Sequence, residues 1–161
     1  MEKRKHPRLK HYDYSQAGYY FITISVAQRL PVLSRVGRGL APAEPPTVSL
    51  TAIGHIAYVQ LMSLPKRYPN LQIDRCVIMP DHIHMILCLE ETAGASPRPT
   101  VPDIIGAYKS LTTRAVNQAM HTPGKQFFQP SFYEHIIRSE ASYIEICRYL
   151  DENPQKWLLR K

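Results

Sequence analysis

Two histidines, His82 and His84, are the clearest candidates for chemistry in this sequence. They stand at the start of a segment that predicts a β-strand, where successive side chains point to opposite faces. We therefore expect both imidazoles on one face, at the strand surface, with Ile83 on the other. Imidazole is a good ligand for divalent cations, so the pair is a candidate metal site. A pair of partly exposed strand histidines that bind nothing is the alternative.

Tyr149 and Asn153 form a second candidate pair, four residues apart on the last predicted helix. This spacing places both side chains on one face of a helix. Tyr149 also points well away from the apolar stripe that this helix carries. An amide oxygen one turn from a phenol can complete a His/His/Asn metal site and bring the phenol beside it. A surface tyrosine, and an asparagine that helps to end the helix, are the alternative.

The chain has ten tyrosines, so other phenols compete with Tyr149 for a chemical role. Tyr108 and Tyr143 lie on apolar helix faces and are predicted to be core residues. Tyr133 shares a strand face with His135, which makes it the better rival. We expect His135 to be a structural histidine, with metal ligation or proton transfer as the alternative.

The elements that must position these residues follow from the apolar periodicity and the turn residues. A Pro-Asp pair between two apolar runs predicts a hairpin, because proline and aspartate favour the central positions of a tight turn. Proline also predicts that the last helix ends before Pro154. The predicted strands are residues 18–26, 71–79, 82–89 and 132–138; the predicted helices start at Ser49 or Thr51 and run to about Pro65, cover residues 103–120, and start after Ser139.

This order of elements predicts an α+β fold with a ferredoxin-like split βαβ arrangement. Such a fold has an antiparallel sheet with helices packed on one face, and here a C-terminal helix carrying Tyr149 is added. We expect one domain over residues 1–161, with a basic N-terminal segment at 1–17. Loops rich in proline and glycine are expected at 35–47 and 92–102.

Composition excludes several classes of protein. Hydrophobic residues make up 44% of the 161 residues and charged residues 20%, which is typical of a globular domain. No apolar run reaches the length of about 18 residues that a transmembrane helix needs. The basic N-terminus is not followed by an apolar signal core, and the three cysteines are widely spaced, so we expect a cytoplasmic, nucleoid-associated protein.

The formal net charge is +7, which favours a polyanionic partner. The N-terminal segment mixes cations with aromatic rings, a mixture that suits backbone contacts and base stacking on single strands. A solubilising tail and solvated helix faces are the alternative. The residues predicted to contact DNA are Arg4, Lys5, Arg8, Lys10, Tyr12, Lys109, Arg114 and Arg138.

Several stretches together resemble the single-tyrosine HUH transposases, and most closely the REP-associated tyrosine transposases, which are relatives of the small insertion-sequence transposases. The resemblance covers nearly the whole chain. It lies in residues 12–15, 18–23, 79–84 (MPDHIH), 108–112 (YKSLT), 132–138 (FYEHIIR) and 149–154 (YLDENP).

The resemblance implies that His82 and His84 hold Mg²⁺ or Mn²⁺ against a DNA phosphate, and that Asn153 is the third ligand. It further implies that Tyr149 attacks this phosphate to form a 5′-phosphotyrosine link, on single-stranded DNA that bears a hairpin. Phosphodiester cleavage requires charge neutralisation, which a metal supplies. A phenol with a pKa of about 10 is a weak nucleophile without a nearby cation.

Two readings from other classes remain. One is a catalytically decayed or domesticated ferredoxin-like protein that binds nucleic acid, and the intact set of His82, His84, Tyr149 and Asn153 favours the enzyme over it. The other is a metallohydrolase, which lacks further His or Asp ligands and ranks last. The resemblance allows a monomer or a homodimer with shared sites, and a monomer is slightly favoured.

Overall fold

The computed structural model describes residues 17–39, 41, 43–91 and 99–160. The described residues form six strands, three α-helices and one short 3-10 helix. In chain order they are β1 (Gly18–Ser25), the short 3-10 helix η1 (Ala27–Arg29), β2 (Ser34–Gly37), β3 (Thr47–Leu50), α1 (Ala52–Arg67), β4 (Leu71–Ile78), β5 (His82–Leu89), α2 (Val101–Met120), β6 (Tyr133–Ile137) and α3 (Glu140–Leu158).

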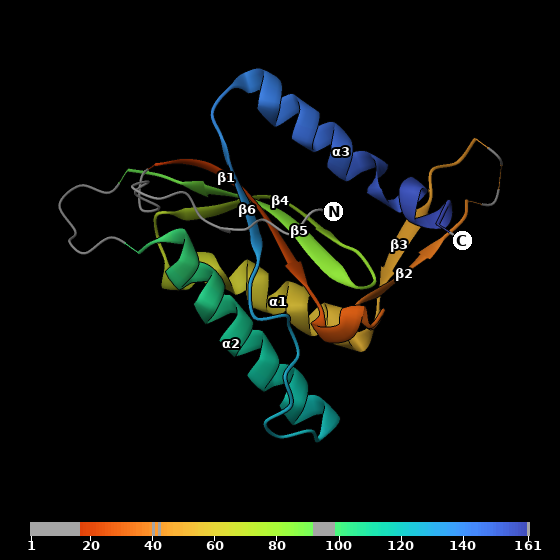
Figure 1. The fold of residues 1–161 in the computed structure, drawn as a ribbon, viewed down its shortest axis with the longest axis horizontal. Helices are drawn as coiled ribbons and strands as arrows, with labels where there is room; N and C mark the ends of the chain where they lie inside the picture. Colours follow the sequence, from red (N-terminus) through yellow and green to blue (C-terminus); the bar gives the residue numbers. More distant parts are fainter. Residues whose placement is uncertain (1–16, 40, 42, 92–98, 161) are drawn as a thin grey trace.

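The main sheet has four antiparallel strands in the order β4-β5-β1-β6. Helices α1 and α2 cover one face of this sheet, and α3 crosses the other (Figure 1). Without α3 this is the ferredoxin-like arrangement, because β5 lies between β4 and β1, and β1 lies between β5 and β6. The predicted fold class is confirmed, and the added helix lies on the face opposite the other two.

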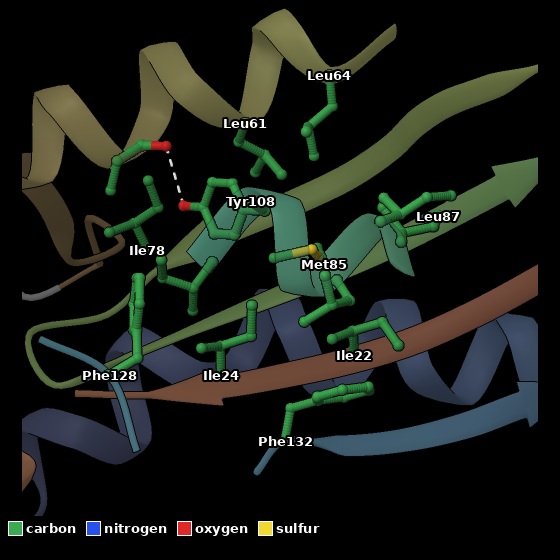
Figure 2. Close-up of a cluster of buried hydrophobic side chains, with 14 of the residues drawn as sticks. Ile22, Ile24, Leu61, Leu64, Ile78, Met85, Leu87, Tyr108, Phe128 and Phe132 are labelled. Atoms are coloured by element: carbon green, nitrogen blue, oxygen red, sulfur yellow. Dashed lines mark hydrogen bonds between the residues drawn. The ribbon is translucent and has the colours of Figure 1, made fainter. Parts of the chain in front are cut away.

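The face covered by α1 and α2 forms an apolar core. Alternation along β1 sends Tyr20, Ile22 and Ile24 into it, and all three are fully buried. Figure 2 shows Ile22 and Ile24 on the same side of the sheet as Leu61 of α1 and Tyr108 of α2. The Tyr108 hydroxyl donates to the Ala57 carbonyl oxygen over 2.9 Å, so even this phenol is satisfied inside the core. Burial raises its pKa, and the prediction of Tyr108 as a core residue is confirmed.

The face covered by α3 has a smaller apolar cluster and a polar rim. Phe21 and Ile86 of the sheet pack against Cys147 and Leu150 of α3. Polar contacts to β4 then fix the helix on the sheet. The Tyr143 hydroxyl donates to Asp74 Oδ2 over 2.6 Å, and Arg75 Nη1 bonds Asp151 Oδ1 over 3.1 Å.

The prediction that the last helix ends before Pro154 is wrong, because α3 continues to Leu158. An interior proline removes one backbone hydrogen bond and crowds the carbonyl four residues earlier. Beside this defect the Asn153 side chain donates from Nδ2 to the Tyr149 carbonyl oxygen over 2.8 Å. Regular bonding resumes beyond it, since the Leu159 amide donates to the Gln155 carbonyl.

The predicted loops also need correction. Residues 35–37 and 47 of the first loop belong to β2 and β3, which pair as a short hairpin. Residues 101 and 102 of the second loop are the first turn of α2, capped by Thr100 in a capping box with Asp103. The expected cap of α1 is confirmed at Thr51, whose side chain accepts from the Gly54 amide.

Some predictions fall outside the described residues. The N-terminal segment and its DNA-binding candidates Arg4, Lys5, Arg8, Lys10 and Tyr12 lie there. The single-domain prediction over residues 1–161 is not tested. Within the part of the chain that the structure describes, no helix is both long enough and apolar enough to cross a membrane.

Candidate metal and nucleophile site

The two histidines lie on one face of β5, as predicted, and this is the face covered by α3. In the sheet register His84 is opposite Thr23 and His82 is opposite Ser25. Both side chains are buried, with exposed fractions of 7% for His82 and 4% for His84. The expectation of histidines at the strand surface is therefore wrong, because α3 and its neighbours cover them.

Both imidazoles are oriented by hydrogen bonds at Nδ1. His82 Nδ1 lies 2.6 Å from Asp81 Oδ1, and His84 Nδ1 lies 2.7 Å from the Thr23 hydroxyl. An ionised carboxylate only accepts, so Nδ1 of His82 carries the proton and Nε2 keeps its lone pair. Such partners fix the tautomer and the ring plane of metal-binding histidines. Nε2 of each ring is the nitrogen that these bonds leave free, and so the candidate ligand atom.

The two imidazole rings lie close together, and one of their nitrogen atoms has no hydrogen-bond partner among the described residues. Their centroids are 4.5 Å apart at 72°. The Nε2 atom of His84 is buried and has no hydrogen-bond partner within the described part of the chain. Burial, with repulsion from His82, lowers the pKa of His84 to about 3, while the Asn153 side chain acts in the opposite direction. His84 is therefore neutral at physiological pH, the state that a metal ligand requires.

Tyr149 comes to these histidines because α3 runs back across the sheet. The helix starts at the Tyr19 end of β1, and Thr23, opposite His84, lies about 13 Å along that strand. Ten helical residues from Ser139 span about 15 Å, which brings Tyr149 level with His84. The ring centroids of Tyr149 and His84 are 5.5 Å apart. Tyr149 is 39% exposed, off the apolar stripe as predicted.

Asn153 joins the same site from one turn further along α3. It is 8% exposed and lies four residues after Tyr149, on the same face of α3, and its side chain opposes the lowering of the pKa of His84. Its Nδ2 is bound to the helix, which leaves Oδ1 as the ligand atom. The described residues hold no group of three or more His, Cys, Asp or Glu side chains able to bind a metal. Any cation here takes its remaining ligands from an amide, water or substrate.

The structure adds residues that sequence reasoning missed. Asp81 was interpreted only as a turn residue, yet its carboxylate bonds both His82 and Arg29. Burial opposes ionisation of Asp81, but the bond from His82 and the charge of Arg29 outweigh it and lower the pKa. The position of Asp81 directly before His82 was a usable signal for its role. No local signal points to Arg29 or Thr23, whose roles depend on strand pairing.

The rival tyrosines differ in their surroundings. Tyr133 of β6 pairs with Thr23 of β1, and Thr23 pairs on its other side with His84 of β5. Tyr133 therefore points to the same face of the sheet as His84 and stays a rival nucleophile. His135 lies on the same face of β6, and its role stays a prediction. Tyr143 is held by Asp74, a hydrogen bond that raises its pKa and makes it a poorer nucleophile. A further cation, Lys156 Nζ, lies 5.1 Å from the centre of the Tyr149 ring.

Three basic residues predicted to contact DNA lie away from the histidines. Lys109 and Arg114 are on α2, on the opposite side of the sheet (Figure 1). Lys109 binds the carbonyl oxygens of residues 129–131, which is a structural contact, and Arg114 bonds Ser110. Arg138 is exposed after β6, at the end of the sheet opposite the histidines. Their contact with DNA stays a prediction.

The chain belongs to the IS200-like transposase family, because the model of that family matches residues 58–153, more than half of the chain. His82, His84, Tyr149 and Asn153 all lie within the match. The predicted relationship to the small insertion-sequence transposases is confirmed, and the protein is a transposase by family. The family assignment indicates an enzyme that nicks and joins DNA.

The chain is also similar to individual proteins. An uncharacterized protein of Haemophilus influenzae is 28% identical over 98% of this chain and 91% of its own. A solved REP-associated tyrosine transposase bound to a REP hairpin superimposes with a TM-score of 0.60 at 21% identity, covering 92% of this chain and 73% of that one. A candidate transposase from Deinococcus radiodurans gives 0.51 at 20% identity over 90% and 95%. The two structures share the fold.

Proposed function

We propose that this transposase is a metal-dependent endonuclease and strand transferase for single-stranded DNA, with Tyr149 as its nucleophile. The observation that carries the proposal is the meeting of four side chains from β5 and α3. The Tyr149 ring lies 5.5 Å from that of His84, beside His82 and Asn153. The chain belongs to a transposase family and has a phenol beside two oriented imidazoles. These are the groups that metal-assisted phosphodiester cleavage requires.

The donor set fits a divalent cation such as Mg²⁺ or Mn²⁺. The centres of the two imidazole rings lie 4.5 Å apart, and Nε2 of His84 is buried without a partner among the described residues. Asn153 Oδ1 supplies an oxygen, which suits a hard cation. Bound there, the cation would neutralise charge on the non-bridging oxygens of the phosphate. A substrate oxygen and water would fill its remaining positions.

The chain's own residues supply the remaining steps. Tyr149 Oη forms a bond to phosphorus while the bond from phosphorus to the 3′ oxygen breaks. The phenolic proton is lost to solvent, and the departing 3′ oxygen gains one. The product is a 5′-phosphotyrosine with a free 3′-hydroxyl, and attack by a second 3′-hydroxyl reverses the step and joins strands.

The proposed substrate is single-stranded DNA with a hairpin, such as an element end. A similar fold has been solved with a REP hairpin bound. Tyr149 sits on a helix fixed to the sheet by Tyr143 and Arg75, so the phosphate must come to it. Single strands bend into such a site readily, whereas bending duplex DNA costs several kcal/mol. The charge of +7 attracts phosphates of any sequence, so binding should weaken with salt.

Nicking of labelled oligonucleotides tests this proposal. We expect a hairpin-bearing single strand to be cut beside the hairpin foot with Mg²⁺ or Mn²⁺, and not with chelator. A fully duplex version of the same sequence is the matched control. Equal cutting of duplex, or cutting that resists chelation, would contradict the proposal.

We also propose that one chain suffices for each site, because His84 and Tyr149 of the same chain already meet. Mixing an inactive His84→Gln chain with an inactive Tyr149→Phe chain should then restore nothing. Restored cleavage would show that the site is shared between two chains of a dimer.

A further inference from the structure

A chain of three side chains leads from the end of β1 to the candidate metal site. Arg29 Nε bonds Asp81 Oδ2 over 3.0 Å, and the other oxygen of that carboxylate, Oδ1, bonds His82 Nδ1 over 2.6 Å. Arg29 Nη1 also bonds the Ser25 hydroxyl over 3.1 Å. The guanidinium therefore bonds both the Asp81 carboxylate and the end of β1, and this fixes the carboxylate in one orientation.

The backbone at Arg29 is in an unfavourable conformation. Gln28 and Arg29 have φ angles of 59° and 54°, in the left-handed region that glycine tolerates and other residues avoid. Two such residues in succession are costly, and strain of this kind concentrates at functional sites. Glycine at position 29 would relieve it. A side chain is therefore kept at this position in spite of the backbone conformation.

The loop itself does not need Arg29 to hold it. The Val26 amide donates to the Asp81 carbonyl oxygen, and the Leu33 amide donates to that of Pro80, both over 2.9 Å. These backbone bonds already fix the turn between β4 and β5 against the end of β1. What they leave undetermined is the rotation of the Asp81 carboxylate, and Arg29 determines that rotation.

We propose that Arg29 is a positioning residue that acts through Asp81 to hold His82 as the Nδ1–H tautomer, with Nε2 presented to the cation. The inference rests on the proposed metal site. Without the guanidinium, Asp81 rotates toward solvent, and His82 loses the acceptor that fixes its tautomer and ring plane. Contacts of this kind beyond the direct ligands commonly change metal affinity by about 10- to 100-fold.

The variant Arg29→Gly separates this role from a structural one, because glycine fits the left-handed backbone. Gln28→Gly is the matched control, since it relieves the same left-handed backbone conformation one residue earlier and leaves the Arg29 guanidinium in place. Asp81→Asn tests the middle of the chain. For each protein, three readouts are collected: the tautomer of His82 by ¹⁵N NMR without metal, the Mn²⁺ dissociation constant by calorimetry, and the melting temperature.

We expect Arg29→Gly to bind Mn²⁺ about tenfold more weakly. Its His82 should show mixed tautomers, and its melting temperature should be unchanged or higher. Asp81→Asn should show at least as large a loss, and Gln28→Gly no change in either His82 or Mn²⁺ binding. Wild-type affinity together with a single His82 tautomer in Arg29→Gly would overturn the proposal, and so would a melting temperature that falls with the affinity. Failure of the wild type to bind Mn²⁺ would refute the proposed metal site, while the metal-free NMR still decides the role of Arg29.

Discussion

The two faces of the sheet are built from the same strands and differ in almost every other respect. On β5, Met85 and Leu87 point toward α1 and α2 and are fully buried among apolar side chains. His82 and His84 alternate with them and point toward α3. They are nearly as buried, but each ring has a polar partner at one nitrogen.

This difference teaches how one small fold separates stability from chemistry. The face under α1 and α2 supplies the apolar burial that drives folding. The face under α3 carries buried polar groups, a costly arrangement unless each is paired, and His84 Nε2 has no hydrogen-bond partner among the described residues. A cation bound at the proposed site would pair this nitrogen. Changes on the two faces should therefore have separable effects.

The largest expected effect is loss of chemistry from the α3 face. The double variant His82→Gln/His84→Gln should lose cleavage by about 10³-fold or more, because metal stabilisation of the transition state is worth several kcal/mol. Its loss of stability should be smaller than that of an apolar truncation on the other face. Single-turnover nicking and urea unfolding measure the two quantities. Undiminished nicking would remove the histidines from the mechanism.

The reverse pattern is expected for Leu87→Ala, on the same strand and the opposite face. Removing a fully buried leucine should lower the free energy of unfolding by about 2–5 kcal/mol. Cleavage per folded molecule should stay near the wild-type rate, measured well below the melting temperature. A large fall in that rate would show that the two faces are not separable.

Acid should weaken the α3 face before the core. His84 has a pKa near 3 in the fold and about 6.5 in an unfolded chain, so only the unfolded chain binds its proton between these limits. Stability from neutral His84 is complete above pH 6.5 and is lost as the pH falls toward 3, by about 2 kcal/mol at pH 5. Urea unfolding from pH 7 to 4 measures this slope, and His84→Gln is the control in which it should be absent. Equal slopes in both proteins would contradict the burial of a neutral ring.

The smallest effect is expected at Asn153. Water can replace a neutral oxygen ligand, so Asn153→Ala should lower the cleavage rate only about tenfold, which equals about 1.4 kcal/mol. The variant also removes the bond from Nδ2 to Tyr149, so its helix content needs checking by circular dichroism. A loss as large as that of the histidine variant would give Asn153 a greater role than ligation.

Much of this division could be predicted from the sequence, because it depends on local periodicity. Alternation placed His82 and His84 on one face, and the four-residue spacing placed Tyr149 and Asn153 together. Family resemblance, more than physics, joined these pairs into one predicted site. Residues 101 and 102 were assigned to a loop because Pro102 obscured the start of α2, where proline is in fact well tolerated.

The rest depends on contacts between distant parts of the chain. The burial of the histidines depends on how α3 packs, and the contact between Arg29 and Asp81 joins residues 52 positions apart. The β2–β3 hairpin was hidden by a stretch rich in glycine and proline, whose pairing local propensity does not reveal. Pro154 was expected to end α3, yet tertiary packing of the helix outweighs the loss of one hydrogen bond.

The central claim is that Tyr149, brought to the histidines by α3, becomes covalently bound to DNA. Mass spectrometry of the protein after reaction with a hairpin oligonucleotide and Mn²⁺, denaturation and trypsin digestion tests it directly, because trypsin separates the candidates. Tyr149 lies in the peptide 149–156, Tyr133 in 126–138 and Tyr143 in 139–148. The account predicts a nucleotide attached to peptide 149–156 in the wild type and none in Tyr149→Phe. A nucleotide on peptide 126–138, or an adduct that persists in Tyr149→Phe, would contradict it.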